Sequence, residues 1–156
     1  DLKFTERDQL NYDSPESIDF DLLNSHISIL KKGIEINIPN YCFSTHLRLN
    51  ETTILKPKKI LIIEGILILS NKMLRDQINY SIFLDCSRNI RFERRLNRDI
   101  KERDRNYDDV VKLFKNRLDK MHNIYVEPIK NHCDLILNTN NKTDISKLIN
   151  IIKEKI

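Results

Sequence analysis

A helical period of apolar positions runs through the first fifth of the chain. The residues that keep this period on one helix face are Ile18, Leu22, Leu23, Ile27 and Leu30. Ser14-Pro15-Glu16 predicts the start of the helix, with a capping hydroxyl, proline at the first helical position and an acid near the positive end of the helix dipole. Lys31-Lys32-Gly33 predicts its end. Residues 1–13 are polar, and we expect them to be irregular.

The next segment changes to the period of a strand. Residues 34–39 alternate apolar and polar, as a half-exposed strand does, and Thr52–Leu55 suits a second strand. Between them, Asn40–Arg48 is expected to form a long loop that carries aromatic side chains. Residues 34–57 are therefore predicted to be a small β-hairpin insertion.

Three later segments are apolar without alternation: Lys59–Glu64, Tyr80–Asp85 and Cys133–Leu137. Such runs are typical of strands buried on both faces of a parallel sheet. Helical patterns separate or follow them at about residues 72–77, 87–102, 107–131 and 143–155. Strands that alternate with helices predict an α/β layered fold. No repeat, low-complexity linker or boundary divides the chain, so we expect one domain over residues 1–156.

Composition narrows the function classes only slightly. The net charge of +4 fits anionic ligands without demanding nucleic acid. No apolar run is long enough to cross a bilayer and no signal peptide opens the sequence, so we expect a cytoplasmic protein with no membrane association. Three isolated cysteines are expected to be reduced thiols. Gly33 and Gly65 are the only glycines, so these 156 residues contain no glycine-rich phosphate loop.

Arginine is concentrated in residues 91–106. Four arginines follow the i, i+3, i+4, i+7 spacing of one helix face: Arg91, Arg94, Arg95 and Arg98. Two more, Arg103 and Arg105, follow where the helix is expected to give way to a loop. Because guanidinium binds phosphate in a planar, bidentate way, the segment suggests a phosphate-facing lid. The alternative is a solvated helix face with Glu93, Asp99 and Glu102 as partners, but the excess of arginine over lysine favours the lid.

Two acids stand at positions that suit ligand binding. Glu64 ends a predicted strand and precedes Gly65, and ligands of open parallel sheets bind beyond such strand ends. A carboxylate there can hold Mg²⁺, although a strand-end acid in solvent is the alternative. Asp13 can accept hydrogen bonds from sugar hydroxyls, but taken alone it favours a turn ahead of Ser14.

Tyr41, Phe43 and His46 lie together in the predicted hairpin loop. Two aromatic rings and an imidazole suit the wall of a site for a flat heterocycle, with hydrogen bonds to its edge. A small satellite core beneath the hairpin fits the same residues equally well. The residues alone leave both interpretations open.

Four ordered motifs together resemble the uridine kinases, the uridine/cytidine phosphotransferases of the P-loop kinase class. Asn11–Pro15 resembles the start of N-F-D-x-P-x-A-F-D, and Pro39–Arg48 resembles P-x-Y-D-F-x-x-H-x-R. Ile63–Ile66 resembles the E-G-I strand end, and Arg94–Arg105 resembles R-R-x-x-R-D-x-x-E-R-G-R. The match is collinear from about residue 10 to residue 138. The resemblance implies a parallel-sheet, P-loop kinase-like three-layer fold with the hairpin as a substrate insertion.

For the nucleoside, the resemblance implies roles for five residues. Asp13 would hold the ribose hydroxyls. Tyr41 and His46 would read the edge of the pyrimidine, and Tyr12 and Phe43 would pack around the base. The sequence departs from the family pattern at one position of this segment, where a cysteine follows Tyr41 in place of an aspartate.

For the phosphates, the resemblance implies roles for five further residues. Glu64 would help to place Mg²⁺. Arg95 and Arg105 would contact the substrate. Arg98 and Arg103 would meet the phosphates of ATP or GTP as catalytic residues when the lid closes.

The implied activity is transfer of the γ-phosphate of ATP or GTP to the 5′-hydroxyl of uridine or cytidine in pyrimidine salvage. The resemblance also implies a homo-oligomer, specifically a tetramer. The family's opening strand, phosphate loop and helix, and its catalytic aspartate, are expected to lie outside this sequence, so the isolated chain is expected to be inactive. Other interpretations are a phosphoribulokinase-like kinase, an arginine-rich nucleic-acid-binding module and a non-catalytic pseudokinase scaffold.

Overall fold

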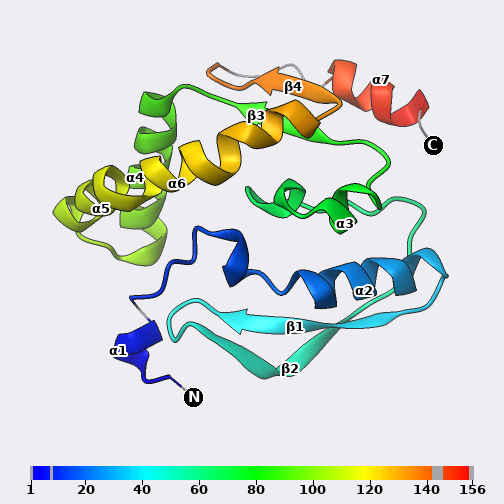
Figure 1. Cartoon of the computed structure of the whole chain (residues 1–156), viewed down its shortest axis with the longest axis horizontal. Coiled ribbons are helices and arrows are strands. Elements are labelled where there is room, and N and C mark those ends of the chain that lie inside the picture. Colours follow the sequence, from blue (N-terminus) through cyan, green and yellow to red (C-terminus); the bar gives the residue numbers. More distant parts are fainter. Residues whose placement is uncertain (1, 8, 142–145, 155–156) are drawn as a thin grey trace. The chain divides into compact units, whose positions relative to one another are not determined.

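The computed structural model describes residues 2–7, 9–141 and 146–154, and the chain divides into two compact units, Asp1–Gln77 and Ile78–Ile156. Figure 1 labels the helices and strands of each unit, which are described in turn. Among the described residues, no helix combines the length and the apolar character needed to cross a bilayer.

The first unit opens with two short helical pieces before its main helix. A single turn, α1 (Phe4–Arg7), lies in the segment expected to be irregular, and a 3-10 turn, η1, spans Pro15–Ser17. The main helix, α2 (Phe20–Lys31), starts later than predicted, because Ile18 is extended and Asp19 caps the helix by accepting a hydrogen bond from the Leu22 N–H at 3.0 Å. The predicted start at Ser14 is therefore wrong.

The C-terminal end of α2 is as predicted. Gly33 adopts a φ of 79° and its N–H donates to the Leu30 carbonyl at 3.0 Å. A residue with a Cβ would be strained in this left-handed conformation, so the glycine fixes the point where the helix ends.

The predicted β-hairpin is confirmed, but its long loop is not. Strand β1 (Ile36–Cys42) pairs antiparallel with β2 (Leu47–Leu55), and the register runs from Ile36 opposite Leu55 to Cys42 opposite Leu47. Only residues 43–46 connect the strands, and His46 takes a left-handed φ of 54° in that turn. The alternation of apolar and polar residues did not predict that β1 continues to Cys42, because the register of the two strands shifts between Pro39 and Tyr41.

The predicted strand at Lys59–Glu64 is wrong. These residues pair with no strand in the part of the chain that the structure describes, and the side chain of Ile62 is 82% exposed. A strand needs a neighbour to satisfy its backbone groups, and the apolar pattern does not say whether one is present.

After this run come a 3-10 turn, η2 (Ile68–Ser70), and the short helix α3 (Lys72–Arg75). The apolar core of this unit is formed by Ile27, Ile36, Leu67, Leu69 and Leu74.

The second unit contains the predicted parallel pairing. Strand β3 (Ile82–Asp85) runs parallel to β4 (Leu135–Asn138), from Ile82 opposite Leu135 to Asp85 opposite Asn138. The parallel pair and its helical crossover confirm the α/β class, while the three-layer P-loop arrangement stays a prediction. The prediction that these strands are buried on both faces is wrong. In the two-stranded sheet that the structure describes, Leu84 of β3 is 64% exposed and Ile136 of β4 is 48% exposed.

The helices of the second unit follow the predicted positions. Helix α4 (Arg88–Arg103) is preceded by Ser87. A continuous helical stretch then comprises α5 (Tyr107–Leu113), the π-helix η3 (Phe114–Leu118), α6 (Asp119–Met121), the π-helix η4 (His122–Val126) and the 3-10 helix η5 (Glu127–His132). Helix α7 spans Ser146–Glu154; residues 143–145 and 155 of its predicted range lie outside the described residues. The core of this unit consists of Val110, Phe114, Leu118, Val126 and Ile129.

Candidate functional site

An aromatic cluster forms where the hairpin turn meets the segment before α2. We use this name for Tyr12, Tyr41, Phe43 and His46. The rings of Tyr12 and His46 stack with centroids 4.9 Å apart and an angle of 13° between their planes. Tyr41 and Phe43 meet edge to face at 5.2 Å. Burial, and then the neighbouring Tyr12 phenol, raise the pKa of Tyr41 above its ordinary value.

The exposure of the aromatic cluster favours a ligand wall over a satellite core. Phe43 is 73% and Tyr41 42% exposed, so these rings are not buried beneath the hairpin. Asp13 directly follows Tyr12, and its backbone N–H donates to the Asn11 side chain at 3.1 Å, which makes the local turn that the sequence favoured. All five residues predicted to contact a nucleoside therefore lie in the first unit, with the four rings gathered at one end of the hairpin.

Asp19 connects helix α2 to the hairpin and was not among the residues predicted from the sequence. Its carboxylate caps α2 and also accepts a hydrogen bond from Arg48 of β2 at 3.1 Å. The bond from the Leu22 N–H, and then the bond from Arg48, lower the pKa of Asp19 below its ordinary value. A signal for this residue was present, because Asp19 occupies the final acid of the N-F-D-x-P-x-A-F-D pattern.

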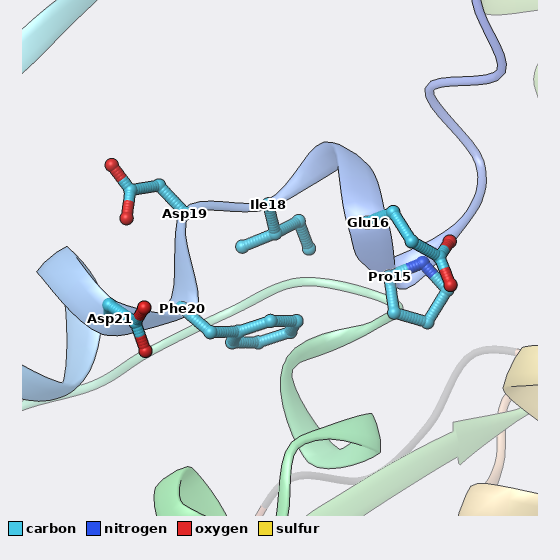
Figure 2. Close-up of a pocket in the computed structure, with 6 residues that line it drawn as sticks. All are labelled: Pro15, Glu16, Ile18, Asp19, Phe20 and Asp21. Atoms are coloured by element: carbon cyan, nitrogen blue, oxygen red, sulfur yellow. The ribbon is translucent and has the colours of Figure 1, made fainter.

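An open pocket of about 460 Å³ lies at the start of α2, and Figure 2 shows the side chains around it. Its lining consists of Pro15, Glu16, Ile18, Asp19, Phe20 and Asp21. None of the residues predicted as site residues lines it. Three carboxylates would repel a polyphosphate, so the phosphate-binding site is not expected in this pocket.

Glu64 is an exposed carboxylate in the segment that precedes η2. Gly65 follows it, and a Cβ at that position would lie 3.0 Å from Ile68 Cγ2, so the close turn favours glycine. The described residues contain no group of three or more His, Cys, Asp or Glu side chains arranged for a metal ion. Mg²⁺ at phosphate sites is commonly held by one or two carboxylates with phosphates and water, and a single exposed carboxylate fits that coordination.

The arginines of α4 do not form one uniform face. Arg88 and Arg91 reach Asp119, with N–O distances of 2.7 and 3.7 Å. Arg94 donates to the carbonyl of Thr139 at 2.5 Å, in the loop after β4. These arginines bond α4 to neighbouring elements of its own unit. The spacing of arginines along the helix therefore did not distinguish those with a structural role from those able to bind a ligand.

Three other arginines gather around one buried acid. We call Arg95, Arg98 and Arg103 the guanidinium cluster. Arg95 Nε donates to Asp99 Oδ2 at 3.1 Å, Arg98 donates to Oδ1 from Nε at 3.0 Å and from Nη2 at 2.8 Å, and Arg103 Nη1 lies 3.8 Å from Oδ1. Asp99 has no exposed surface. Burial alone would raise the pKa of Asp99, but the bond from Arg98 and the charges of the three arginines hold it below its usual range.

The turn after α4 brings Arg105 back toward Asp99. Asp104 adopts a left-handed conformation, with φ 50° and ψ 37°, where the family pattern has glycine. The N–H groups of Asp104 and Arg105 both point to the Asp99 carbonyl, the latter at 3.1 Å. Of the ten predicted site residues, the five assigned to the nucleoside and Glu64 therefore lie in the first unit, and the four arginines lie in the second.

A further polar network joins η5 to the carboxyl end of β3. Lys130 Nζ lies 2.9 Å from Asp85 and 2.6 Å from Glu127, and His122 Nε2 lies 3.2 Å from Glu127. The bond to Glu127 is the main cause that raises the pKa of Lys130, while burial lowers that of His122. These contacts join η4 and η5 to β3 within the second unit, which is a structural role for His122, Glu127 and Lys130.

Comparisons with known proteins bear on the whole chain. The family model described as Phosphoribulokinase / Uridine kinase family matches residues 1–146. The uridine kinase of Escherichia coli (strain K12) is 39% identical over 155 residues, which cover 99% of this chain and 72% of that protein. The uridine kinase of Proteus mirabilis (strain HI4320) is 40% identical over 156 residues, which cover 100% of this chain and 72% of that protein. These matches confirm the resemblance drawn from the motifs. The chain belongs to the phosphoribulokinase and uridine kinase family.

Proposed function

We propose that this chain carries the nucleoside-binding hairpin and the phosphate-facing arginines of a kinase that transfers the γ-phosphate of ATP or GTP to the 5′-hydroxyl of uridine or cytidine. In this proposal Asp13 accepts hydrogen bonds from the ribose hydroxyls. Tyr41 and His46 bond to the edge of the base, and Tyr12 and Phe43 pack around it.

The stack of Tyr12 on His46 carries the proposal. Residues far apart in the sequence meet with rings 4.9 Å apart, and exposed Phe43 continues the aromatic surface. A flat heterocycle gains contact area and edge hydrogen bonds on such a surface. A sugar phosphate without a base would leave those rings unused, so the cluster favours a nucleoside over the substrate of a phosphoribulokinase-like enzyme.

Positive charge is proposed to act on the phosphates. Arg98 and Arg103 are assigned to the phosphates of the donor, and Arg95 and Arg105 to the substrate. Glu64 is assigned as a ligand of Mg²⁺, which would neutralise charge on the transferring phosphoryl group. Phosphoryl transfer depends mainly on positioning and charge neutralisation, which these side chains are suited to supply.

Pairing of the arginines disfavours a nucleic-acid-binding module. A binder of the phosphate backbone uses arginines that are open to solvent along a surface. Here Arg88, Arg91 and Arg94 are engaged by neighbouring elements of their unit, so α4 does not present an open row of arginines along its length.

The complete enzyme is proposed to act in pyrimidine salvage in the cytoplasm as a homo-tetramer. No residue of the printed sequence is assigned as the base that takes the proton of the 5′-hydroxyl, and the sequence has no G-x-x-x-x-G-K-[ST] motif. We therefore propose that these 156 residues alone have negligible kinase activity. A pseudokinase would stay inactive even when the family's phosphate-loop segment is supplied.

Isothermal titration of the chain with uridine, cytidine, 2′-deoxyuridine and ribulose 5-phosphate tests the nucleoside site. We expect the two ribonucleosides to bind, and 2′-deoxyuridine to bind more weakly because it lacks one hydroxyl for Asp13. His46→Ala should weaken uridine binding about thirtyfold, since a ring stack and a hydrogen bond are each worth about 1 kcal/mol.

His132→Ala is the matched control, because His132 is exposed in the second unit. It should leave uridine affinity unchanged. The same preparation, given ATP, Mg²⁺ and uridine, should show negligible turnover. Preferential binding of ribulose 5-phosphate, or equal effects of the two histidine variants, would contradict the proposed nucleoside site.

A further inference from the structure

Asp99 is the one fully buried carboxylate among the described residues, and three arginines surround it. We infer that Asp99 is a positioning residue for phosphate binding, whose carboxylate holds Arg95, Arg98 and Arg103 in place as a preformed cluster for a polyphosphate. This inference rests on the proposed function, in which these arginines meet phosphate, and it names a residue that the motif roles did not include.

Charge is the first support for this role. Three guanidinium groups and one carboxylate leave two net positive charges in the guanidinium cluster. That remainder complements a dianionic phosphate group. Without the carboxylate, three guanidinium groups would repel one another, and the same arrangement would be held only when an anion is bound.

Donor geometry is the second support. An arginine has five N–H donors, and Arg98 uses Nε and Nη2 for Asp99. Both bonds fix the plane of the guanidinium, and three N–H donors remain directed away from Asp99. The side chain of Arg98 is 40% and that of Arg103 41% exposed, whereas Asp99 is inaccessible. A ligand can therefore reach the arginines without displacing their anchor.

The backbone of Asp99 is the third support. Its carbonyl accepts the N–H groups of Asp104 and Arg105, so the residue that orients the arginines of α4 also fixes the turn that leads to Arg105. One residue thus organises arginines on both sides of the helix end, through its side chain on one side and its carbonyl on the other.

A neutralising role would look different from a positioning role. If Asp99 only reduced repulsion, removing its charge would make the cluster more positive and would tighten anion binding. If Asp99 positions the arginines, removing its charge weakens binding although the net positive charge increases. The two roles therefore predict opposite changes in anion affinity when the charge of Asp99 is removed.

The test is titration of the chain with inorganic tripolyphosphate at fixed ionic strength. We expect wild-type binding, and a Kd about tenfold higher for Asp99→Asn, because preorganised donors are lost. Glu102→Gln is the matched control, since it removes the same charge from an exposed site on α4. It should leave the Kd unchanged or slightly lower. Far-UV circular dichroism establishes that each variant is folded.

A measurement on the wild-type chain makes the test independent of variant folding. Nitrogen-15 relaxation should give Arg98 Nε an order parameter near the rigid-backbone range, about 0.85, before any anion is added. Tripolyphosphate that fails to bind wild type, binding that is unchanged or tighter in Asp99→Asn, or an Arg98 order parameter below about 0.6 would each overturn the role of Asp99. Failure of uridine to bind would overturn the nucleoside site alone.

Discussion

Replacement of Asp19 separates two contributions that one carboxylate makes to the first unit. Asp19 accepts the Leu22 N–H at 3.0 Å as the cap of α2 and pairs with Arg48 of β2 at 3.1 Å. Asp19→Ala removes both interactions. Asp19→Asn keeps an oxygen for the cap but removes the charge, and Arg48→Met removes only the ion pair.

The expected losses differ because the two interactions differ in strength. A side-chain cap is worth about 1 kcal/mol. The ion pair has side chains 43% and 51% exposed, so we expect about 0.5 kcal/mol from it. Asp19→Ala should therefore lower the free energy of unfolding by about 1.5 kcal/mol, and Asp19→Asn and Arg48→Met by about 0.5 kcal/mol each.

Urea unfolding followed by circular dichroism measures these differences. Since the folded pKa of Asp19 is lowered, its charge-dependent contribution is present above its unfolded pKa of about 3.9 and is lost as pH falls through the folded pKa. The difference between wild type and Asp19→Asn should thus shrink in acid. Equal losses for the Ala and Asn variants at neutral pH would refute the capping contribution.

Two further predictions follow from single residues. Asp104→Val should lower the free energy of unfolding by about 1–2 kcal/mol in the same urea assay, because a β-branched residue bears the full cost of the left-handed conformation. Asp104→Gly should change the free energy of unfolding by less than about 1 kcal/mol. Equal effects of the two variants would argue against the left-handed conformation of Asp104. Iodoacetamide should alkylate Cys42 increasingly as pH rises through about 7, since hydrogen bonds from Ser44 and then Thr45 lower its thiol pKa to about 7. Mass spectrometry should find Cys133 slower at pH 7, because burial raises its pKa, and the reverse order would contradict these assignments.

The sequence predicted elements whose signals are local. The end of α2 at Gly33 depends on one residue's backbone freedom, and the hairpin depends on alternation within a short segment. The start of α2 was misplaced because Ser14 and Asp19 both suit a cap, and the choice between them depends on the extended conformation of Ile18. Local chemistry thus offered two solutions, and packing decided between them.

The pattern of apolar and polar residues did not predict contacts between segments that lie far apart in the sequence. The run at Lys59–Glu64 has the composition of a buried strand, but strand formation depends on a partner elsewhere in space. The resemblance identified the aromatic residues as a group, and the structure adds that Tyr12 stacks on His46. Spacing placed Arg91 and Arg98 on one helix face, whereas the positions of Asp119 and Asp99 decide their contacts.

The apolar run from Ile60 to Ile63, in which Ile60, Leu61 and Ile62 are exposed, has a consequence for handling the chain. Four consecutive branched apolar residues, without proline or charge, have the composition that favours intermolecular β-stacking when their backbone is unpaired. Lys58 and Lys59 precede the run and Glu64 follows it, so like charges on neighbouring molecules oppose such stacking. Because salt screens that repulsion, we expect concentrated solutions of the chain to stay clear at low ionic strength and to become turbid as salt is raised.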